Sequence, residues 1–132
     1  MKDLLTIKNL DVGYASKTST TKLIGDIDLR VGRGETIAIL GLNGCGKTTF
    51  LKTIKRELEE LSGDVLIENT SIKKIGNRDL AKQIASVSTY FENPGQINVE
   101  ELIGFGRYPF TGRLHYLSNE DQFQIDNAIA IV

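Results

Sequence analysis

The stretch from Gly41 to Thr48 constrains the fold of this chain of 132 residues more than any other part of the sequence. It fits the pattern G-x-x-x-x-G-K-[ST] completely. Before it, the apolar run Thr36–Leu40 predicts a short strand buried on both faces. After it, apolar residues spaced by three, four and seven between Lys47 and Leu58 predict a helix. A strand, a glycine-rich loop and a helix in this order are typical of an α/β domain that binds phosphate.

The residue types in this loop suit the recognition of phosphate oxygens. Glycines let backbone N–H groups approach a ligand, and the helix start adds free N–H groups and a positive dipole end. We expect Lys47 to reach the outer phosphates, Thr48 to contact Mg²⁺ and Thr49 to contact an inner phosphate. Cys45 is interpreted as a spacer, although a helix N-terminus can also activate a thiol. The alternative for the whole motif is a glycine-rich turn without a ligand.

Alternating apolar residues predict a β-hairpin before this loop. Residues 5–12 and 22–31 alternate as two strands, and the polar segment 16–21 between them suits a hairpin loop. Residues 65–67 and 85–88 are predicted as further short strands.

Capping signals predict three helices in the second half of the chain. Asn77 begins the first of them. Asn98 and Glu101 have the spacing of a capping box, which predicts the start of the second. Ser118 begins the last helix, whose acidic first turn suits the helix dipole.

Composition excludes several kinds of partner and site. The net charge of −1, from 16 Lys and Arg and 17 Asp and Glu residues, gives no support for nucleic acid as a partner. One cysteine excludes an intramolecular disulfide and a cysteine-cluster zinc site, and the single His115 argues against a multi-histidine metal centre. The longest apolar run is too short to span a membrane, and the N-terminus lacks a secretory signal. We therefore expect an intracellular domain.

The residues from Gly34 to Leu51 resemble the ATP-binding subunit of ABC transporters. The family pattern here is G-E, an apolar strand and G-x-N-G-x-G-K-[ST]-T-L-L, which this sequence matches closely. Ser62 and Gly63, followed by an apolar run, also resemble the family's next strand. The resemblance implies an α/β fold, the N-terminal portion of a P-loop NTPase of the ABC ATPase type. That portion comprises an antiparallel β subdomain, the strand, loop and helix around the phosphate, and the start of a helical subdomain.

The resemblance also implies ATP and Mg²⁺ as ligands and a set of residues that bind them. Tyr14 occupies the place of the aromatic residue that stacks on adenine in this family; the alternative is a tyrosine that only covers the sheet. Thr48 is the expected Mg²⁺ ligand. The predicted nucleotide-binding residues are Tyr14, Gly41, Asn43, Gly44, Cys45, Gly46, Lys47, Thr48 and Thr49.

A second stretch is similar to the branch of the family that serves iron–siderophore, haem and cobalamin importers. It runs over residues 99–110 and 117–128, and its most specific part is the element G-R-x-P-[FHY] at Gly106–Phe110. In that branch this helical region faces the permease in the membrane. The resemblance therefore implies permease subunits and a second ATPase subunit as partners. It also implies a cytoplasmic position at the inner face of the cell membrane.

The sequence departs from the family pattern in two places. Thr89 stands where the family has a glutamine, since Gln83 comes too early and Gln96 too late; Glu92 is considered as a water-mediated metal contact. The family's L-S-G-G-Q signature, Asp-Glu strand and switch histidine are not present, and His115 is interpreted as a surface residue. We therefore expect an N-terminal part with an incomplete core and no catalytic residues within this chain.

These observations predict one ATP-binding domain in two sections. Residues 1–97 are expected to form the nucleotide-binding core and the β subdomain, and residues 98–132 the beginning of the helical subdomain. The predicted function is ATP binding, with hydrolysis in the full-length parent, that energises an importer of iron–siderophore or a related metal chelate. One alternative is a truncated or degenerate module that binds nucleotide or a partner without catalysis. Another is an ABC ATPase acting on ribosomes or DNA, which the charge disfavours.

Overall fold

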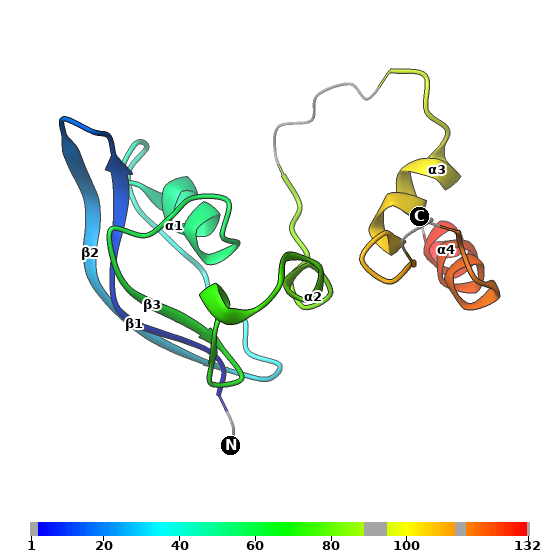
Figure 1. The fold of residues 1–132 in the computed structure, drawn as a ribbon, viewed down its shortest axis with the longest axis horizontal. Helices are drawn as coiled ribbons and strands as arrows, with labels where there is room; N and C mark the ends of the chain where they lie inside the picture. The colour runs from blue at the N-terminus through cyan, green and yellow to red at the C-terminus, as the bar shows by residue number, and fades with distance from the viewer. Residues whose placement is uncertain (1–2, 89–94, 113–115, 132) are drawn as a thin grey trace. The chain divides into compact units, whose positions relative to one another are not determined.

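A computed structural model describes residues 3–88, 95–112 and 116–131 of the chain. The elements follow the order β1-β2-α1-β3-β4-η1-α2-α3-η2-α4, where η denotes a short 3₁₀ helix. The chain divides into two compact units, Met1–Gly76 and Asn77–Val132 (Figure 1). The first unit holds the sheet with α1 and η1, and the second unit holds the remaining helices.

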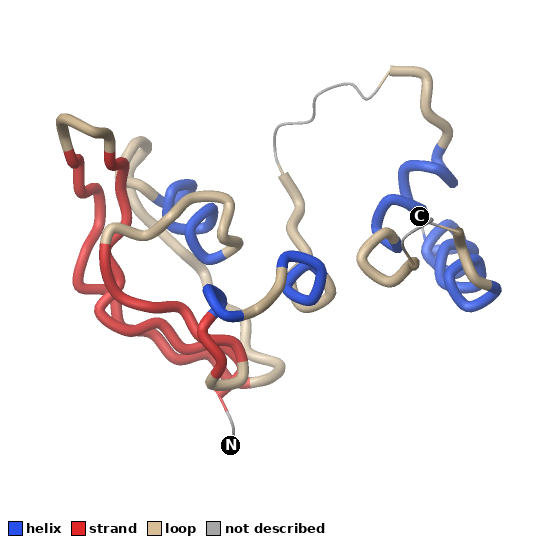
Figure 2. Tube along the Cα trace, viewed as in Figure 1, coloured by secondary structure: helices blue, strands red, loops and turns tan. Residues whose placement is uncertain are grey.

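A four-stranded antiparallel sheet forms the first unit, with strand order β2-β1-β3-β4 (Figure 2). The strands are β1 (Asp3–Ala15), β2 (Thr20–Gly32), β3 (Ser62–Ile67) and β4 (Thr70–Ser71). The predicted hairpin is confirmed: β1 and β2 pair directly, and its turn is closed by the Ser16 N–H, which donates to Ser19 O at 2.7 Å. The cross-strand pair Leu10–Ile27 shows how the alternation brings apolar residues opposite one another.

The helix that follows the glycine-rich loop covers one part of this sheet. This helix, α1 (Lys47–Ile54), lies against β1 and buries Phe50 and Thr53. The neighbouring strand residues Ile7, Leu10 and Val12 are almost completely buried. Helix and sheet together therefore form the small core that holds the loop in place.

The helix α1 begins at the predicted residue but ends at Ile54, four residues before Leu58, so the predicted length is wrong. Arg56 has φ +59°, which takes the chain out of the helix. The Arg56 N–H donates to Thr53 O at 3.0 Å and the Glu57 N–H donates to Lys52 O at 2.9 Å, the pair of bonds of a Schellman motif. The Arg56 side chain, which donates to Ile75 O at 2.6 Å, ties this helix end to the segment after η1 (Ile72–Lys74).

Two predicted strands, at 36–40 and 85–88, are absent from the described structure. Leu40 is 90% exposed, so the burial on both faces expected for residues 36–40 is also wrong, and Val87 in the second segment is fully exposed. A strand needs a neighbour that completes its ladder of hydrogen bonds. Among the described residues no strand pairs with either segment, so both remain loop.

The second unit is helical; the predicted caps at Asn98 and Ser118 are confirmed, whereas Asn77 is itself the first residue of its helix. It contains α2 (Asn77–Ala81), α3 (Val99–Gly104), η2 (Phe105–Arg107) and α4 (Asn119–Ile131). At α3, the Glu101 N–H donates to Asn98 Oδ1 at 2.8 Å and the Asn98 N–H donates to Glu101 Oε2 at 3.2 Å, which completes the capping box. The helices α3 and α4 pack together, with Ile125 buried beside Gly104.

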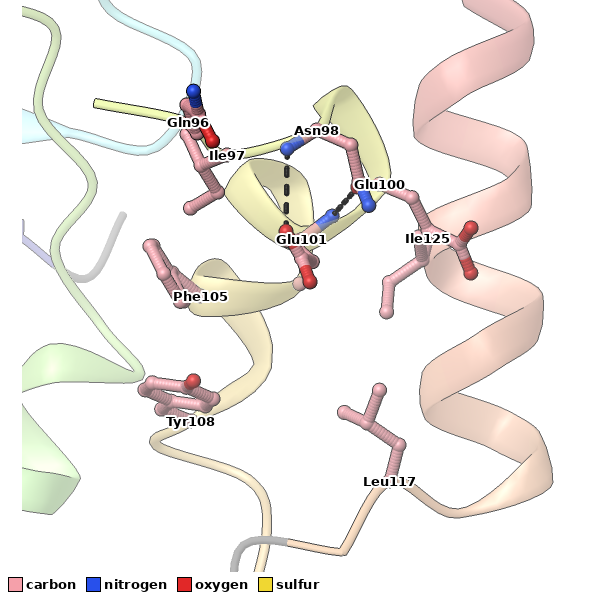
Figure 3. A pocket seen from close by; sticks show the side chains of 10 residues that line it. Gln96, Ile97, Asn98, Glu100, Glu101, Phe105, Tyr108, Leu117 and Ile125 are labelled. Carbon is pink, nitrogen blue, oxygen red and sulfur yellow. Dashed lines mark hydrogen bonds between the residues drawn. The ribbon is translucent and has the colours of Figure 1, made fainter. Parts of the chain in front are cut away.

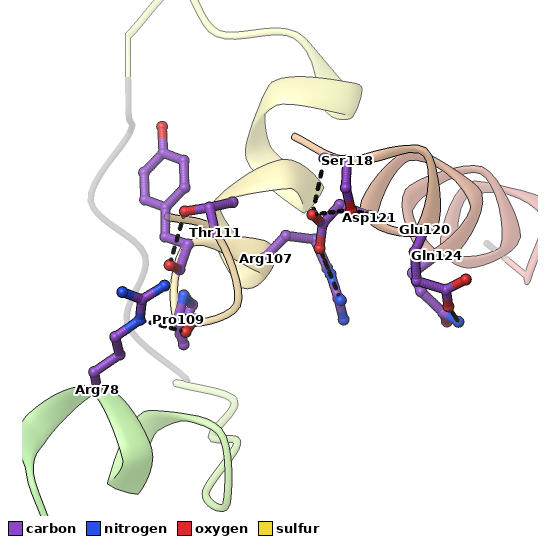
Figure 4. A network of polar contacts seen from close by, with 9 residues as sticks. Arg78, Arg107, Pro109, Thr111, Ser118, Glu120, Asp121 and Gln124 are labelled. Atoms are coloured by element: carbon purple, nitrogen blue, oxygen red, sulfur yellow. Dashed lines mark hydrogen bonds and ion pairs between the residues drawn. The ribbon is translucent and has the colours of Figure 1, made fainter. Parts of the chain in front are cut away.

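An ion pair holds η2 to the start of α4 (Figure 4). Arg107 Nε donates to Asp121 Oδ1 at 2.9 Å, and Arg107 Nη2 lies 2.8 Å from the same oxygen. The other carboxylate oxygen accepts from the Ser118 hydroxyl at 2.6 Å and the Ser118 N–H at 3.0 Å. The guanidinium carbon of Arg107 also lies 4.1 Å from the centre of the Phe110 ring. The hydrogen bonds from Ser118, and then the one from Arg107, lower the pKa of Asp121 to about 2.

This network predicts a defined acid sensitivity of the second unit. Because the pKa of Asp121 is lowered on folding from 3.8 to about 2, its stabilising effect is complete above pH 3.8 and is lost as the pH falls towards 2. We expect the urea midpoint, followed by far-UV circular dichroism, to fall over this range. Asp121→Asn lowers the midpoint already at pH 6 and flattens the acid dependence. Asp126→Asn, on the same helix, is the control; an equally flat acid dependence in that variant contradicts the assignment.

Candidate functional site

The glycine-rich loop leads directly into α1 and closes around its lysine. Lys47 Nζ donates to Gly41 O and to Leu42 O, each at 2.7 Å, and lies 3.8 Å from the Cys45 sulfur. The first hydrogen bond of the helix runs from the Phe50 N–H to Gly46 O at 2.8 Å. The N–H groups between these two residues therefore precede the intrahelical ladder, and Gly46 has no side chain that could cap them. A helix start of this kind attracts anions.

A cavity of about 400 Å³ lies between the loop and the hairpin. It brings together seven of the nine predicted residues with one residue of β2. Its lining residues are Tyr14, Leu23, Asn43, Gly44, Gly46, Lys47, Thr48 and Thr49. Gly41 and Cys45 do not line it: Gly41 contributes the carbonyl that binds Lys47, and Cys45 is exposed. Three separate elements, β1, β2 and the start of α1, thus border one space.

Tyr14 stands at the sheet side of this cavity. It pairs with Thr21 near the end of the hairpin, and its side chain reaches α1, where its hydroxyl lies 3.2 Å from Thr49 Oγ1. The residue is 53% exposed, so part of its ring is available to a ligand. A tyrosine ring of this kind can stack on a planar base.

Leu23 is the cavity residue that sequence reasoning missed. The alternation of β2 assigns either Leu23 or Ile24 to the buried face, together with other core positions. In the structure Ile24 pairs with Val12, while Leu23 is 38% exposed and lines the cavity. The signal that could have found it is the hairpin register, which brings Leu23 near Tyr14 across the two strands.

The residues that line the cavity suit a metal ion whose coordinating oxygens come mainly from a bound phosphate compound and water. The described residues contain no group of three or more His, Cys, Asp or Glu side chains that could hold a metal. Thr48, which carries a hydroxyl, does line the cavity. Mg²⁺ commonly takes only one or two protein oxygens and completes its shell with phosphate oxygens and water. The residues present therefore fit Mg²⁺ bound together with a phosphate ligand.

Three positions discussed from the sequence lie outside the described residues. These are Thr89, at the expected glutamine position, and Glu92 and His115.

The second unit contains a larger cavity, of about 730 Å³ (Figure 3). It combines aromatic side chains of the α3–η2 segment with apolar residues of α4 and the segment before it. It is lined by Gln96, Ile97, Asn98, Glu100, Glu101, Gly104, Phe105, Tyr108, Leu117 and Ile125. The described lining includes two carboxylates and no lysine or arginine, so its charge is negative. No helix in the described parts of the chain has the length and apolar character needed to cross a bilayer.

The antiparallel sheet, the phosphate loop at a helix start and the appended helices define a P-loop nucleotide-binding protein. The ABC transporter family model matches residues 24–131, and the chain belongs to this family. This confirms the family and the fold class expected from the sequence.

The relatives also confirm the predicted similarity to siderophore import subunits. The achromobactin transport ATP-binding protein CbrD of Dickeya dadantii is 31% identical over 95% of this chain and 45% of its own length. The petrobactin import ATP-binding protein FpuD of Bacillus anthracis is 32% identical over 98% of this chain and 46% of its own length. The chain thus spans about half the length of these curated relatives.

A solved structure shows the same fold. The ATP-binding cassette MJ0796, in a dimeric post-hydrolysis state bound to ADP and phosphate, superposes with a TM-score of 0.71. The two are 19% identical over 96% of this chain and 56% of the cassette chain.

Proposed function

We propose that this chain is the nucleotide-binding part of an ATPase subunit that energises an importer. The observation that carries the proposal is the single cavity that joins the Tyr14 ring to the phosphate loop. The adenine of ATP stacks on Tyr14 and contacts Leu23, while the phosphates lie in the loop before α1. Asn43, Gly44 and Gly46 form the wall of the phosphate end.

Lys47 is the cation of this site. Its ammonium group now lies between two carbonyl oxygens of the loop, at 2.7 Å from each. Phosphate oxygens carry full negative charge and make stronger hydrogen bonds to an ammonium than carbonyls do. Binding of ATP therefore draws Lys47 from the carbonyls of Gly41 and Leu42 to the outer phosphates.

Thr48 would hold Mg²⁺ through its hydroxyl, in the same cavity. The ion neutralises charge on the outer phosphates when it is bound. The described cavity lining includes no carboxylate that could complete a metal shell or orient water. We therefore assign binding to this chain and hydrolysis to a cassette of the relatives' full length.

The second unit is proposed to contact permease subunits, and a second ATPase subunit completes the transporter. The relatives that support this are named for the import of siderophores. The negative charge and aromatic lining of the 730 Å³ cavity suit a segment with basic and apolar residues. We propose an iron–siderophore or related chelate as cargo, and a position at the inner face of the membrane. Co-purification with a permease rather than with nucleic acid tests this assignment.

Calorimetric titration of ATP into the purified chain, with and without Mg²⁺, tests the nucleotide site. We expect ATP to bind at least ten times more tightly with Mg²⁺, because the ion offsets the charge of the outer phosphates. Thr48→Val removes most of this enhancement, and Thr18→Val in the exposed hairpin turn leaves it unchanged. Failure of the folded chain to bind ATP in either condition contradicts the proposal.

A nucleotide-binding module without catalysis is the second candidate function. The absence of a carboxylate from the described cavity lining favours it for this chain. Phosphate release by the purified chain tests whether this chain binds nucleotide without hydrolysing it. We expect none above background; turnover that disappears in Lys47→Ala would show that this chain holds a complete catalytic site.

A further inference from the structure

The hydrogen bond between Tyr14 and Thr49 joins the two ends of the cavity. Tyr14 belongs to β1 and Thr49 is the third residue of α1, yet their hydroxyl oxygens lie 3.2 Å apart. Thr49 is only 5% exposed, whereas Tyr14 is 53% exposed, and both line the same space. The hydroxyl of Thr49 thus contacts the tyrosine at a cavity that the phosphate loop also borders.

We propose that these two hydroxyls form a relay that couples the tyrosine to phosphate binding. In the relay the Tyr14 O–H donates to Thr49 Oγ1, and the Thr49 O–H donates to a phosphate oxygen of the bound nucleotide. The inference rests on the proposed function, and it adds a role for Tyr14 that is independent of base stacking. Tyr14 is then a positioning residue that acts on the phosphate through Thr49.

The donor and acceptor inventory sets the direction of the relay. Without a ligand, either Tyr14 or Thr49 can donate in their shared bond. A hydroxyl has one hydrogen and two acceptor lone pairs, and ionised phosphate oxygens only accept. Thr49 can therefore bond to phosphate only by donating, which leaves its oxygen to accept from Tyr14. The phenol is the better donor of the two, and consecutive hydrogen bonds polarise and strengthen one another.

The position of Thr49 supports this direction. It lies in the first turn of α1, next to the N–H groups that precede the helical ladder. Its neighbour Thr53 donates its hydroxyl to Thr49 O at 3.0 Å, so that carbonyl is already engaged. The hydroxyl of Thr49 is the group that contacts Tyr14 of the sheet, and its hydrogen can serve the ligand.

Inorganic pyrophosphate separates the relay from stacking, because it has phosphates and no base. Affinities of ADP and of pyrophosphate are measured by displacement of a fluorescent nucleotide from the purified chain. We expect Tyr14→Phe, which keeps the ring and removes the hydroxyl, to weaken both ligands by about three- to tenfold, the size of one hydrogen bond. Tyr116→Phe removes an exposed phenol hydroxyl in the second unit and leaves both affinities unchanged.

Variants of Thr49 complete the test. Thr49→Val weakens both ligands at least as much as Tyr14→Phe does, and adding Tyr14→Phe to it has no further effect, since the relay is already broken. Thr49→Ser keeps the hydroxyl and restores most of the affinity. Unchanged pyrophosphate binding in Tyr14→Phe overturns the relay but leaves the proposed function intact. A wild-type chain that binds neither ligand overturns both.

Discussion

Replacing Lys47 with alanine is expected to abolish detectable binding of Mg-ATP to this chain. Lys47 is the only cationic side chain among the described residues that line the cavity. Each hydrogen bond between charged groups contributes about 1.5–3 kcal/mol, and the ammonium can serve two phosphates. Lys47→Ala should therefore weaken binding by a factor of about 100 or more, measured by calorimetric titration.

Lys52→Ala is the matched control for this prediction. Lys52 is an exposed lysine on the same helix, five residues after Lys47. Its replacement removes the same charge from the unit but changes no residue that lines the cavity, so the affinity for Mg-ATP should stay within a factor of two. Equal losses in Lys47→Ala and Lys52→Ala would mean that only the net charge of the unit matters. That result would contradict a site built around Lys47.

Gly46→Ala is expected to reduce both the stability of the first unit and its affinity for nucleotide. Gly46 has φ +102°, which side chains disfavour, and an added Cβ would lie 3.0 Å from Ile24 Cγ1 and 3.2 Å from Leu23 Cβ. A strained backbone costs about 1–2 kcal/mol, and crowding of a packed contact adds about 1–3 kcal/mol. We expect the free energy of unfolding to fall by about 2–5 kcal/mol in urea denaturation.

The affinity of Gly46→Ala for nucleotide should fall as well, because relief of the contact with β2 moves the loop that leads into α1.

Gly34→Ala separates the two contributions to the loss of stability. Gly34 has φ +78°, but no atom lies within 4 Å of its added Cβ. This control should cost only the backbone term, about 1–2 kcal/mol, and leave ATP binding unchanged. Equal losses of stability in the two variants would show that the close approach of Gly46 to β2 has no energetic effect.

Local patterns predicted most of the elements because their causes lie within a few residues. The capping box of Asn98 and Glu101 and the acidic start of α4 depend only on neighbours in the chain, and both are present. The hairpin of β1 and β2 follows from alternation and a polar turn. The strand predicted at 36–40 failed because an apolar run becomes a strand only beside another strand, and no local pattern supplies that neighbour.

The sequence by itself determined the family, the phosphate loop and the residue types at the phosphate end of the site. These depend on residues that follow one another in the chain, from Gly41 to Thr48. Only the tertiary structure decided that the Tyr14 hydroxyl meets Thr49, and that Leu23 rather than Ile24 borders the cavity. Both depend on the register of the hairpin and the packing of α1 on β1, since those set which residues distant in sequence come into contact.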